Sequence, residues 1–218
     1  MLYPFTGSIQ QYNARVELRQ EGDRCRPLKC PQCESKQPLV CHGFYERTLE
    51  DQAEGFVIRV RRYLCAACRR TVSLLPEFVL PYIRFTIRTM ASFLKARLIE
   101  RQTLKAAAEA AHQVRMPYQR GQQWVDRFGR QAEGLSLSLA ALTAPVEATD
   151  FVTKAITMLE QTGWIQAHRF LLTALRVHML GWPRFLAPSG IVVTMPGADP
   201  TSPNLPQSTC MASESFPA

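Results

Sequence analysis

Long apolar runs are missing from this sequence. No stretch of about 18 uncharged apolar residues occurs, which argues against a helix that spans a membrane. The most apolar late stretch, residues 164–182, is interrupted by His168, Arg169, Arg176 and His178. The N-terminus also lacks the basic-then-apolar order of a secretory signal. We therefore expect a soluble, cytoplasmic protein in a reducing compartment.

The sequence also lacks internal repeats and a catalytic set of carboxylates, and both absences limit the classes of protein to which it can belong. No internal repeat is evident beyond two cysteine pairs. The carboxylates after residue 130, which have no alternating strand pattern around them, are Glu133, Glu147, Asp150, Glu160, Asp199 and Glu214. A catalytic carboxylate set for two metal ions is not supported, so we expect neither an enzyme nor a small-molecule substrate. The hydrophobic content of 46% is nevertheless enough for packed cores, which argues against disorder of the whole chain.

Positive charge is concentrated in the first part of the chain. Residues 1–130 hold 22 Lys and Arg against 12 Asp and Glu, whereas residues 131–218 hold 4 against 6. A basic soluble domain most often binds nucleic acid. A solvated surface of high pI is an alternative that charge alone leaves open.

Four of the seven cysteines form two matched pairs, "CPQC" at residues 30–33 and "CAAC" at residues 65–68. Two such pairs, brought together by a hairpin, give the tetrahedral geometry of a closed structural zinc site. The predicted ligands are Cys30, Cys33, Cys65 and Cys68. Zinc is favoured over free thiols, disulfides and a rubredoxin-type iron site, which uses the same ligands. Cys41 and His42 are weaker substitutes, and Cys25 and Cys210 are expected to take no part.

The residues between the pairs predict a β-hairpin. "LVCHGFYERTLE" is followed by the turn-like "DQAEG" and then by "FVIRVRRYLC". Phe56, Ile58 and Val60 occupy every second position, which is the period of a half-buried strand. We therefore expect a small zinc-ribbon unit over residues 25–80, preceded by an N-terminal arm over residues 1–24.

Residues 81–130 change to a helical period. Residues 87–98 share an apolar face, Thr103 is a suitable N-cap for a short alanine-rich helix, and Pro117 suits the first turn of a third helix. Trp124 and Phe128 would share the buried face of that helix. This outline predicts a helix-turn-helix.

The last third of the chain carries weaker signals. Residues 131–180 are expected to begin with a linker or a weak helix, up to residue 150, and to continue as a helical segment over residues 151–180 that is broken at Gly163. Residues 151–180 are a candidate for homodimer formation. Residues 181–218 hold 7 of the 15 prolines and predict a disordered tail. The predicted class is α+β.

Two groups of residues are candidates for DNA contacts. Arginines at one end of the hairpin can contact phosphates, although charged protection of an edge strand is an alternative. They are Arg59, Arg61, Arg62, Arg69 and Arg70. The third helix would enter the major groove, where Gln can pair with adenine and Arg with guanine, although a merely packed helix would look similar. Its candidate residues are Arg115, Tyr118, Gln119, Arg120, Gln122 and Gln123.

The segments "CPQCESKQPLVCHGFYERTLED" and "VRRYLCAACRRTVSLLPEFVLPYIRFT" resemble the N-terminal zinc-ribbon module of bacterial insertion-sequence transposases, and most closely a family of uncharacterised bacterial proteins that share it. The resemblance covers roughly residues 28–130. It implies zinc at the paired cysteines and DNA contact near Arg115 and residues 118–123. Such a transposase would continue into a nuclease domain, which residues 131–218 do not resemble.

The expected function is therefore that of a zinc-stabilised protein that binds double-stranded DNA, related to the recognition end of a transposase. One alternative is the DNA-recognition subunit of an active transposase. Another is a rubredoxin-like electron carrier.

Overall fold

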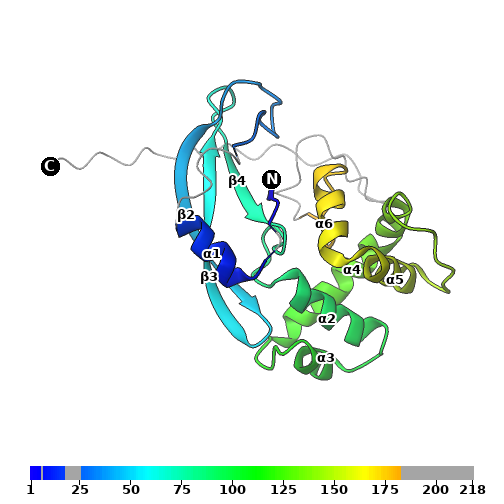
Figure 1. Ribbon diagram of the computed structural model, residues 1–218. Helices are drawn as coiled ribbons and strands as arrows, with labels where there is room; N and C mark the ends of the chain where they lie inside the picture. Colours follow the sequence, from blue (N-terminus) through cyan, green and yellow to red (C-terminus); the bar gives the residue numbers. More distant parts are fainter. Residues whose placement is uncertain (6, 18–25, 183–218) are drawn as a thin grey trace, which may run out of the picture.

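The computed structural model describes residues 1–5, 7–17 and 26–182 and has the α+β architecture predicted from the sequence. In chain order, its elements are β1 (Leu2–Tyr3), α1 (Ile9–Glu17), β2 (Val40–Asp51), β3 (Glu54–Leu64), β4 (Thr71–Pro76), α2 (Ile87–Leu98), α3 (Leu104–Ala110), α4 (Tyr118–Leu139), α5 (Phe151–Thr162) and α6 (Trp164–Thr173). The sheet and α1 form one side of the molecule, and α2–α6 form the other (Figure 1).

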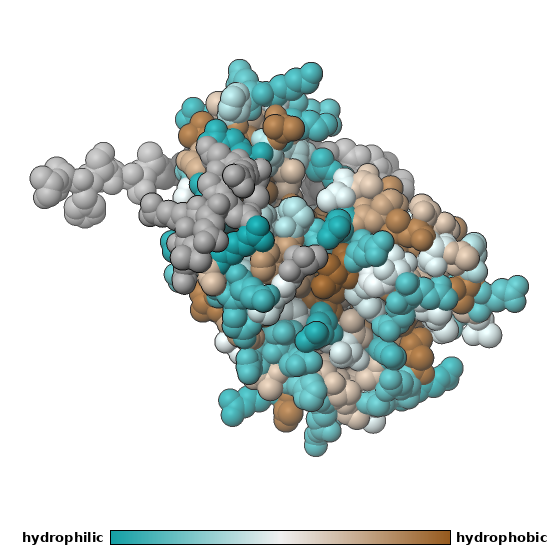
Figure 2. Space-filling model, viewed as in Figure 1, coloured by the Kyte–Doolittle hydropathy of each residue, from teal (hydrophilic) through white to brown (hydrophobic). Residues whose placement is uncertain are grey.

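The surface in this view is mostly hydrophilic, and its hydrophobic residues form small separate patches (Figure 2). Among the described residues, no helix combines the length and the apolar character needed to cross a membrane. The disordered tail predicted for residues 181–218 lies, beyond Trp182, outside the described residues.

The predicted hairpin is the centre of a four-stranded sheet with the order β1-β4-β3-β2. β2 pairs antiparallel with β3, β4 adds antiparallel to β3, and β1 adds parallel to β4. The β2–β3 register shifts between Cys41 and Phe44. Gly43 has a φ of 75° at this bulge, a left-handed conformation that glycine adopts without steric cost.

Side chains alternate between a buried and an exposed face over residues 57–60 of β3, as the sequence predicts, whereas Tyr63, on the side of Val57, is fully buried. Ile58 and Val60 are fully buried, whereas Val57 is 51% exposed and Arg59 is also exposed. The register places Leu49 of β2, which is fully buried, on the same side as Ile58. We call the opposite side of the β2–β3 hairpin, which carries Val57 and Arg59, the outer face.

Residues 1–5 and 7–17, expected to be part of an arm, belong to the sheet unit. β1 pairs with β4, and α1 contacts β3 beyond the residues that β4 covers. There the Tyr12 hydroxyl donates to the Arg59 carbonyl (3.0 Å) and the Asn13 amide donates to the Val57 carbonyl (2.8 Å). The two side chains thus satisfy strand carbonyls that have no partner strand on that side.

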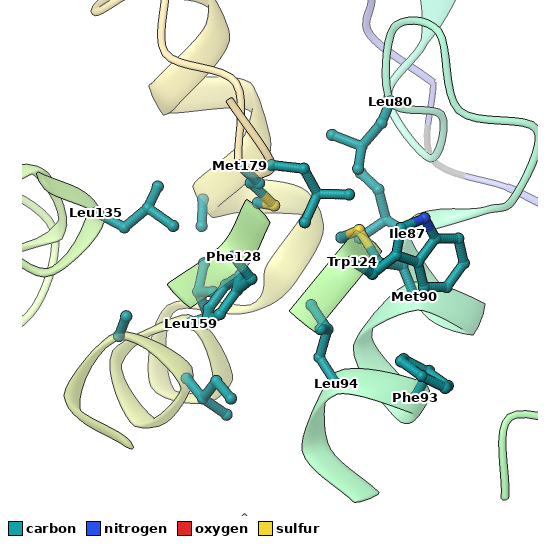
Figure 3. Close-up of a cluster of buried hydrophobic side chains, with 14 of the residues drawn as sticks. Leu80, Ile87, Met90, Phe93, Leu94, Trp124, Phe128, Leu135, Leu159 and Met179 are labelled. Atoms are coloured by element: carbon teal, nitrogen blue, oxygen red, sulfur yellow. The ribbon is translucent and has the colours of Figure 1, made fainter. Parts of the chain in front are cut away.

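Helices α2–α6 pack around a separate apolar core (Figure 3). Trp124 of α4 is 1% exposed and packs edge-on against Phe85 and Phe93, with ring centres 4.9 and 5.5 Å apart. Phe128, one turn further along, is fully buried, so the shared buried face of Trp124 and Phe128 is confirmed. Thr103 caps α3 through a backbone N–H three residues later, also as predicted.

Helix α4 is longer than the sequence pattern predicts. It spans 22 residues, so residues 131–139, expected to be a linker or a weak helix, form its last turns. Leu135 and Leu139 are fully buried and extend its apolar face. Gly121 weakens an isolated helix, but here a Cβ atom at this position would lie 2.8 Å from Cζ of Phe93. The break predicted at Gly163 lies between α5 and α6.

The tip of the hairpin is fastened to the helices. The hydroxyl of Thr86, the N-cap of α2, donates to Asp51 (2.5 Å), and the Gln52 N–H donates to the Thr89 hydroxyl (2.8 Å). The side-chain amide of Gln113, which lies between α3 and α4, donates to the Gln52 carbonyl. The hairpin is therefore held both at the start of α2 and at the connection between α3 and α4.

Two buried imidazoles lie in and just after α6. His168 and His178 are 0% and 1% exposed. Nε2 of His178 lies 3.0 Å from the Pro81 carbonyl, and its Nδ1 accepts a backbone N–H, which places the ring proton on Nε2. Burial lowers the pKa of His168 to about 3 and that of His178 to about 4, so both rings are neutral at pH 7.

Candidate metal centre and basic surfaces

The two cysteine pairs lie at the end of the hairpin opposite its tip. Cys30 and Cys33 precede β2, and Cys65 and Cys68 follow β3, so the antiparallel strands bring the pairs together as predicted. In Figure 1 this end is at the top of the view, and α2 and α3 are at the bottom.

Both pairs form the same kind of turn, which we call the first (residues 30–35) and the second (residues 65–70) cysteine turn. In the first, the Cys30 N–H donates to the Ser35 carbonyl (3.0 Å) and the Cys30 carbonyl accepts the Glu34 N–H (2.9 Å). The second turn repeats both bonds from Cys65 at the same distances. Glu34 and Arg69 occupy equivalent positions and have φ values of 58° and 56°. The two turns therefore present their sulfurs in equivalent ways.

The four cysteine sulfurs lie within 4.8 Å of one another. The Sγ atoms of Cys30 and Cys68 are 3.8 Å apart, and those of Cys33 and Cys65 are 3.7 Å apart. A tetrahedron with Zn–S bonds of about 2.3 Å has sulfur–sulfur edges of about 3.8 Å. The sulfurs thus fit four-coordinate metal binding, and this cluster can hold a metal ion.

Backbone N–H groups favour the thiolate form of Cys65, whereas burial opposes it, and the pKa of Cys33 is raised to about 12 by burial and by the neighbouring cysteines. Cys30 and Cys65 are fully buried, Cys68 is half-buried and Cys33 is exposed. A hydrogen bond from the Cys68 backbone N–H is the main cause that lowers the pKa of Cys65 to about 7. The Gln32 N–H points at the Cys30 sulfur, 3.4 Å away. Because metals bind the thiolate, these N–H groups prepare the site for a cation.

The other cysteines do not join this cluster within the part of the chain that the structure describes. Cys41 and His42 are exposed on β2, and the cluster contains neither of them. Cys25 and Cys210, expected to take no part, lie outside the described residues.

The segment that joins the cysteine turns to the first helices is similar to a known family. Residues 30–114 match the family described as "Domain of unknown function (DUF6431)". This DUF6431-like segment contains all four paired cysteines, the hairpin, β4, α2 and α3, and it ends before α4. Comparisons with curated proteins and with solved structures found no match. The DUF6431-like segment therefore includes both the cysteine cluster and the helices at the hairpin tip, and the match indicates no activity.

The five candidate arginines of the hairpin lie in three different places. Those on β3 lie on two faces, because successive strand residues point to opposite sides. Arg59 and Arg61 lie on the outer face, both near the Phe44 ring. Arg62 lies on the other face, over the Tyr45 ring. The remaining two, exposed on the second cysteine turn, are Arg69 and Arg70. The predicted single cluster is therefore divided.

The candidate base-reading residues surround the start of α4. Those that are exposed are Arg115, Tyr118, Gln119, Arg120 and Gln123. Gln122 is half-buried and donates to Asp126 of the same helix (2.8 Å). The connection between α3 and α4, residues 111–117, is longer than the turn of about four residues typical of a helix-turn-helix.

Two residues outside the predicted set support these surfaces. Arg176, which follows α6, donates to the Pro31 carbonyl in the first cysteine turn (3.2 Å). Phe44 contacts both outer-face arginines. No sequence signal indicates the Phe44 contacts, because they depend on the register shift at Gly43. No sequence pattern connects Arg176 with a turn so distant along the chain.

Proposed function

We propose that this chain is a zinc-stabilised protein that binds double-stranded DNA, related to the recognition end of a transposase and without a catalytic domain of its own. The cluster of four cysteine sulfurs beside exposed arginines is the observation that carries the proposal. Four thiolates leave no coordination position for water, so the metal would be structural. The proposal places the protein in the cytoplasm, where thiols stay reduced.

Zinc would hold the open end of the hairpin. Leu39 is the one buried residue between positions 31 and 39, so this segment has little apolar core of its own. Metal binding at such a site contributes about 10–16 kcal/mol at neutral pH, which is enough to order both cysteine turns. The four ligands would be the paired cysteines.

DNA recognition would combine two surfaces. Arginines of the hairpin and the second cysteine turn would contact phosphates and supply affinity that is independent of sequence and sensitive to salt. The start of α4 would enter the major groove, where Arg115, Gln119, Arg120 and Gln123 would reach base edges. The positive end of the helix dipole, with no acidic residue in the first turn, favours a polyanion there.

Metal content tests the first half of the proposal. Elemental analysis of the purified protein should find about one zinc ion per chain. Cys65→Ser should lose it, whereas Cys41→Ser, which changes an exposed cysteine outside the cluster, should retain it. Full zinc content in Cys65→Ser would remove the assignment. A red protein that contains iron would instead favour the electron carrier.

Selection from random duplex oligonucleotides with the zinc-loaded protein tests the second half. We expect an enriched motif, and we expect Arg120→Ala to weaken binding most for that motif, because a base-edge contact is lost. Equal loss on all sequences would make Arg120 a phosphate contact. Failure to bind any duplex in dilute buffer would reject the proposed function. Strand cleavage by the pure protein with Mg²⁺ would contradict the absence of catalysis.

Self-association is a separate part of the proposal. The homodimer expected from residues 151–180 would involve α5 and α6. Sedimentation of the zinc-loaded chain distinguishes one copy from two.

A further inference from the structure

The connection between α3 and α4 presents an exposed valine beside the tip of the hairpin (Figure 1). Val114 is 75% exposed, and Tyr118, the first residue of α4, is 71% exposed. Only Leu28 is more exposed than these two among the large hydrophobic residues that the structure describes. A single exposed hydrophobic residue is common on protein surfaces, so the setting of Val114 decides whether it has a binding role.

Val114 and Arg115 are the two central residues of a turn whose ends are fixed. The Met116 N–H donates to the Gln113 carbonyl (2.9 Å), which closes the turn. Gln113 is 7% exposed, and its side-chain amide donates to the Gln52 carbonyl at the hairpin tip. The side chain of Met116 packs against the helical core. The turn is therefore anchored at both ends, and it leaves Val114 and Arg115 exposed between them.

Valine is an unusual residue for the middle of a turn. Turns favour Gly, Pro, Asn, Asp and Ser, because these residues adopt the required backbone conformations or hydrogen-bond to their own backbone. Valine has neither property, and Val114, which is exposed, gains little from packing. A local preference that is broken without a gain for the fold points to a functional position. Because valine is restricted to few rotamers, Val114 also loses little freedom when it contacts a ligand.

The residues around Val114 are polar or cationic. No Asp or Glu occurs from residue 110 to residue 125, whereas this segment contains Arg115 and Arg120, both exposed. An apolar protein partner would need a contiguous apolar patch. A single apolar side chain among hydrogen-bonding groups instead matches the major-groove edge of an A·T pair, where the thymine methyl group lies beside hydrogen-bond donors and acceptors. The two arginines favour the same polyanion.

We propose that Val114 contacts the 5-methyl group of a pyrimidine in the major groove of duplex DNA, next to the base that Arg115 reads. This inference rests on the proposed DNA binding and adds a residue that determines specificity and the chemical group that it recognises. Thymine carries this methyl group, and 5-methylcytosine carries it at the same ring position. The turn before α4, and not the helix alone, would thus read the sequence.

The test uses the full, zinc-loaded chain and the motif enriched from random synthetic duplexes. Each thymine of the motif is replaced in turn by deoxyuridine, which removes the methyl group and keeps every hydrogen-bonding group of the base pair. Fluorescence anisotropy of a labelled duplex measures each affinity. At one thymine the replacement should weaken wild-type binding about fourfold, the effect of burying one methyl group. Val114→Ala should abolish this difference between thymine and deoxyuridine.

Two variants control for other effects. Arg115→Ala should weaken binding to both duplexes and keep the difference between them, because it removes the neighbouring contact and not the methyl contact. Leu137→Ala should change neither affinity, because Leu137 is also exposed (68%) but lies about 28 Å along α4 from Tyr118. Circular dichroism verifies the fold of each variant, and Val114→Ser replaces Val114→Ala if the alanine variant is unfolded.

A second modification separates the two sources of the methyl group. If no thymine of the motif responds to deoxyuridine, each cytosine is replaced in turn by 5-methylcytosine. One such replacement should then strengthen wild-type binding about fourfold, and it should leave Val114→Ala unchanged.

The outcomes distinguish this inference from the proposed function. A methyl effect that persists in full in Val114→Ala would overturn the assignment of Val114 while DNA binding itself stands. A motif that is insensitive to both base modifications would overturn it as well, and so would the lack of any enriched motif in a chain that binds duplexes. Failure of the wild-type chain to bind any duplex would instead overturn the proposed function.

Discussion

Acidification should destabilise this protein through the two buried imidazoles, His168 and His178. Burial lowers their pKa values from the ordinary 6.5 to about 3 and about 4. Between these values and 6.5 the unfolded chain binds protons that the folded chain does not bind, so the free energy of unfolding falls as the pH falls. This contribution is complete above pH 6.5 and is lost progressively below it.

The expected loss is large on the scale of protein stability. Each pH unit below the unfolded pKa costs about 1.4 kcal/mol per ring, so the two rings together lose about 4 kcal/mol at pH 5. Typical domains are stable by about 5–15 kcal/mol. The groups whose positive charge opposes protonation are His178 and the Met1 amino group for His168, and Arg127 for His178. Each of these groups is cationic in acid, so protonation of either ring gains no attractive partner from them.

Urea titrations at about pH 7.5 and pH 5 on the wild type and His168→Leu would measure this effect. The Val79 backbone is close to the His168 ring, but neither ring nitrogen has a hydrogen-bond partner of normal geometry among the described residues, so leucine loses little. His168→Leu should lose about 2 kcal/mol less on acidification than the wild type. His42→Gln, which changes an exposed histidine, should lose as much as the wild type.

Loss of the proposed zinc in acid would affect the wild type and both variants alike, so it cancels in the comparison. An equal loss in the wild type and His168→Leu would refute the reasoning.

Three smaller perturbations address the packing of α4, the second cysteine turn and the two cores. Gly121→Ala should lower the free energy of unfolding by about 1–3 kcal/mol in denaturant titrations, because its methyl group would lie 2.8 Å from Cζ of Phe93. Gly129→Ala, in open space on the same helix, should raise it by up to about 1 kcal/mol, and equal effects would contradict the packing argument. Arg69→Gly should raise Tm, because glycine relieves about 1 kcal/mol of left-handed strain at a φ of 56°; a lower Tm would count against this. Chelation should reduce the strand signal in circular dichroism but leave the helical signal, because the helices have their own core, whereas joint loss would show that both cores unfold as one.

The hairpin and the sulfur cluster follow from local patterns in the sequence. The period of two around Ile58 and Val60 predicts the buried side of that part of β3. The matched spacing of the cysteine pairs identifies the four cysteines that the strands bring together. The opposite orientation of Arg61 and Arg62 was also predictable, because adjacent strand residues face opposite ways. The contact between Arg61 and Phe44 was not, since it depends on the register shift at Gly43.

Other parts of the fold depend on contacts that are distant along the chain. β1, with two residues, and α1, with nine, are too short to show a hydrophobic period in the sequence. Their place is set by contacts such as those of Tyr12 and Asn13 with carbonyls of β3, far away in the sequence. The end of α4 contains glycine and serine, which favour a linker by propensity. Burial of Leu135 and Leu139 in the helical core outweighs that preference.

At one end β2 and β3 lead to the cysteine turns, and at the other end they meet at Gln52, which is bonded to Thr89 of α2. The length of the two strands therefore sets the distance between the cysteine cluster and the helices at the hairpin tip. Each residue adds about 3.3 Å. Deleting two residues from each strand would bring the ends about 7 Å closer and keep Arg59 and Arg61 pointing outward. Deleting one would turn them inward. Related proteins whose hairpins differ in length should therefore differ by an even number of residues in each strand.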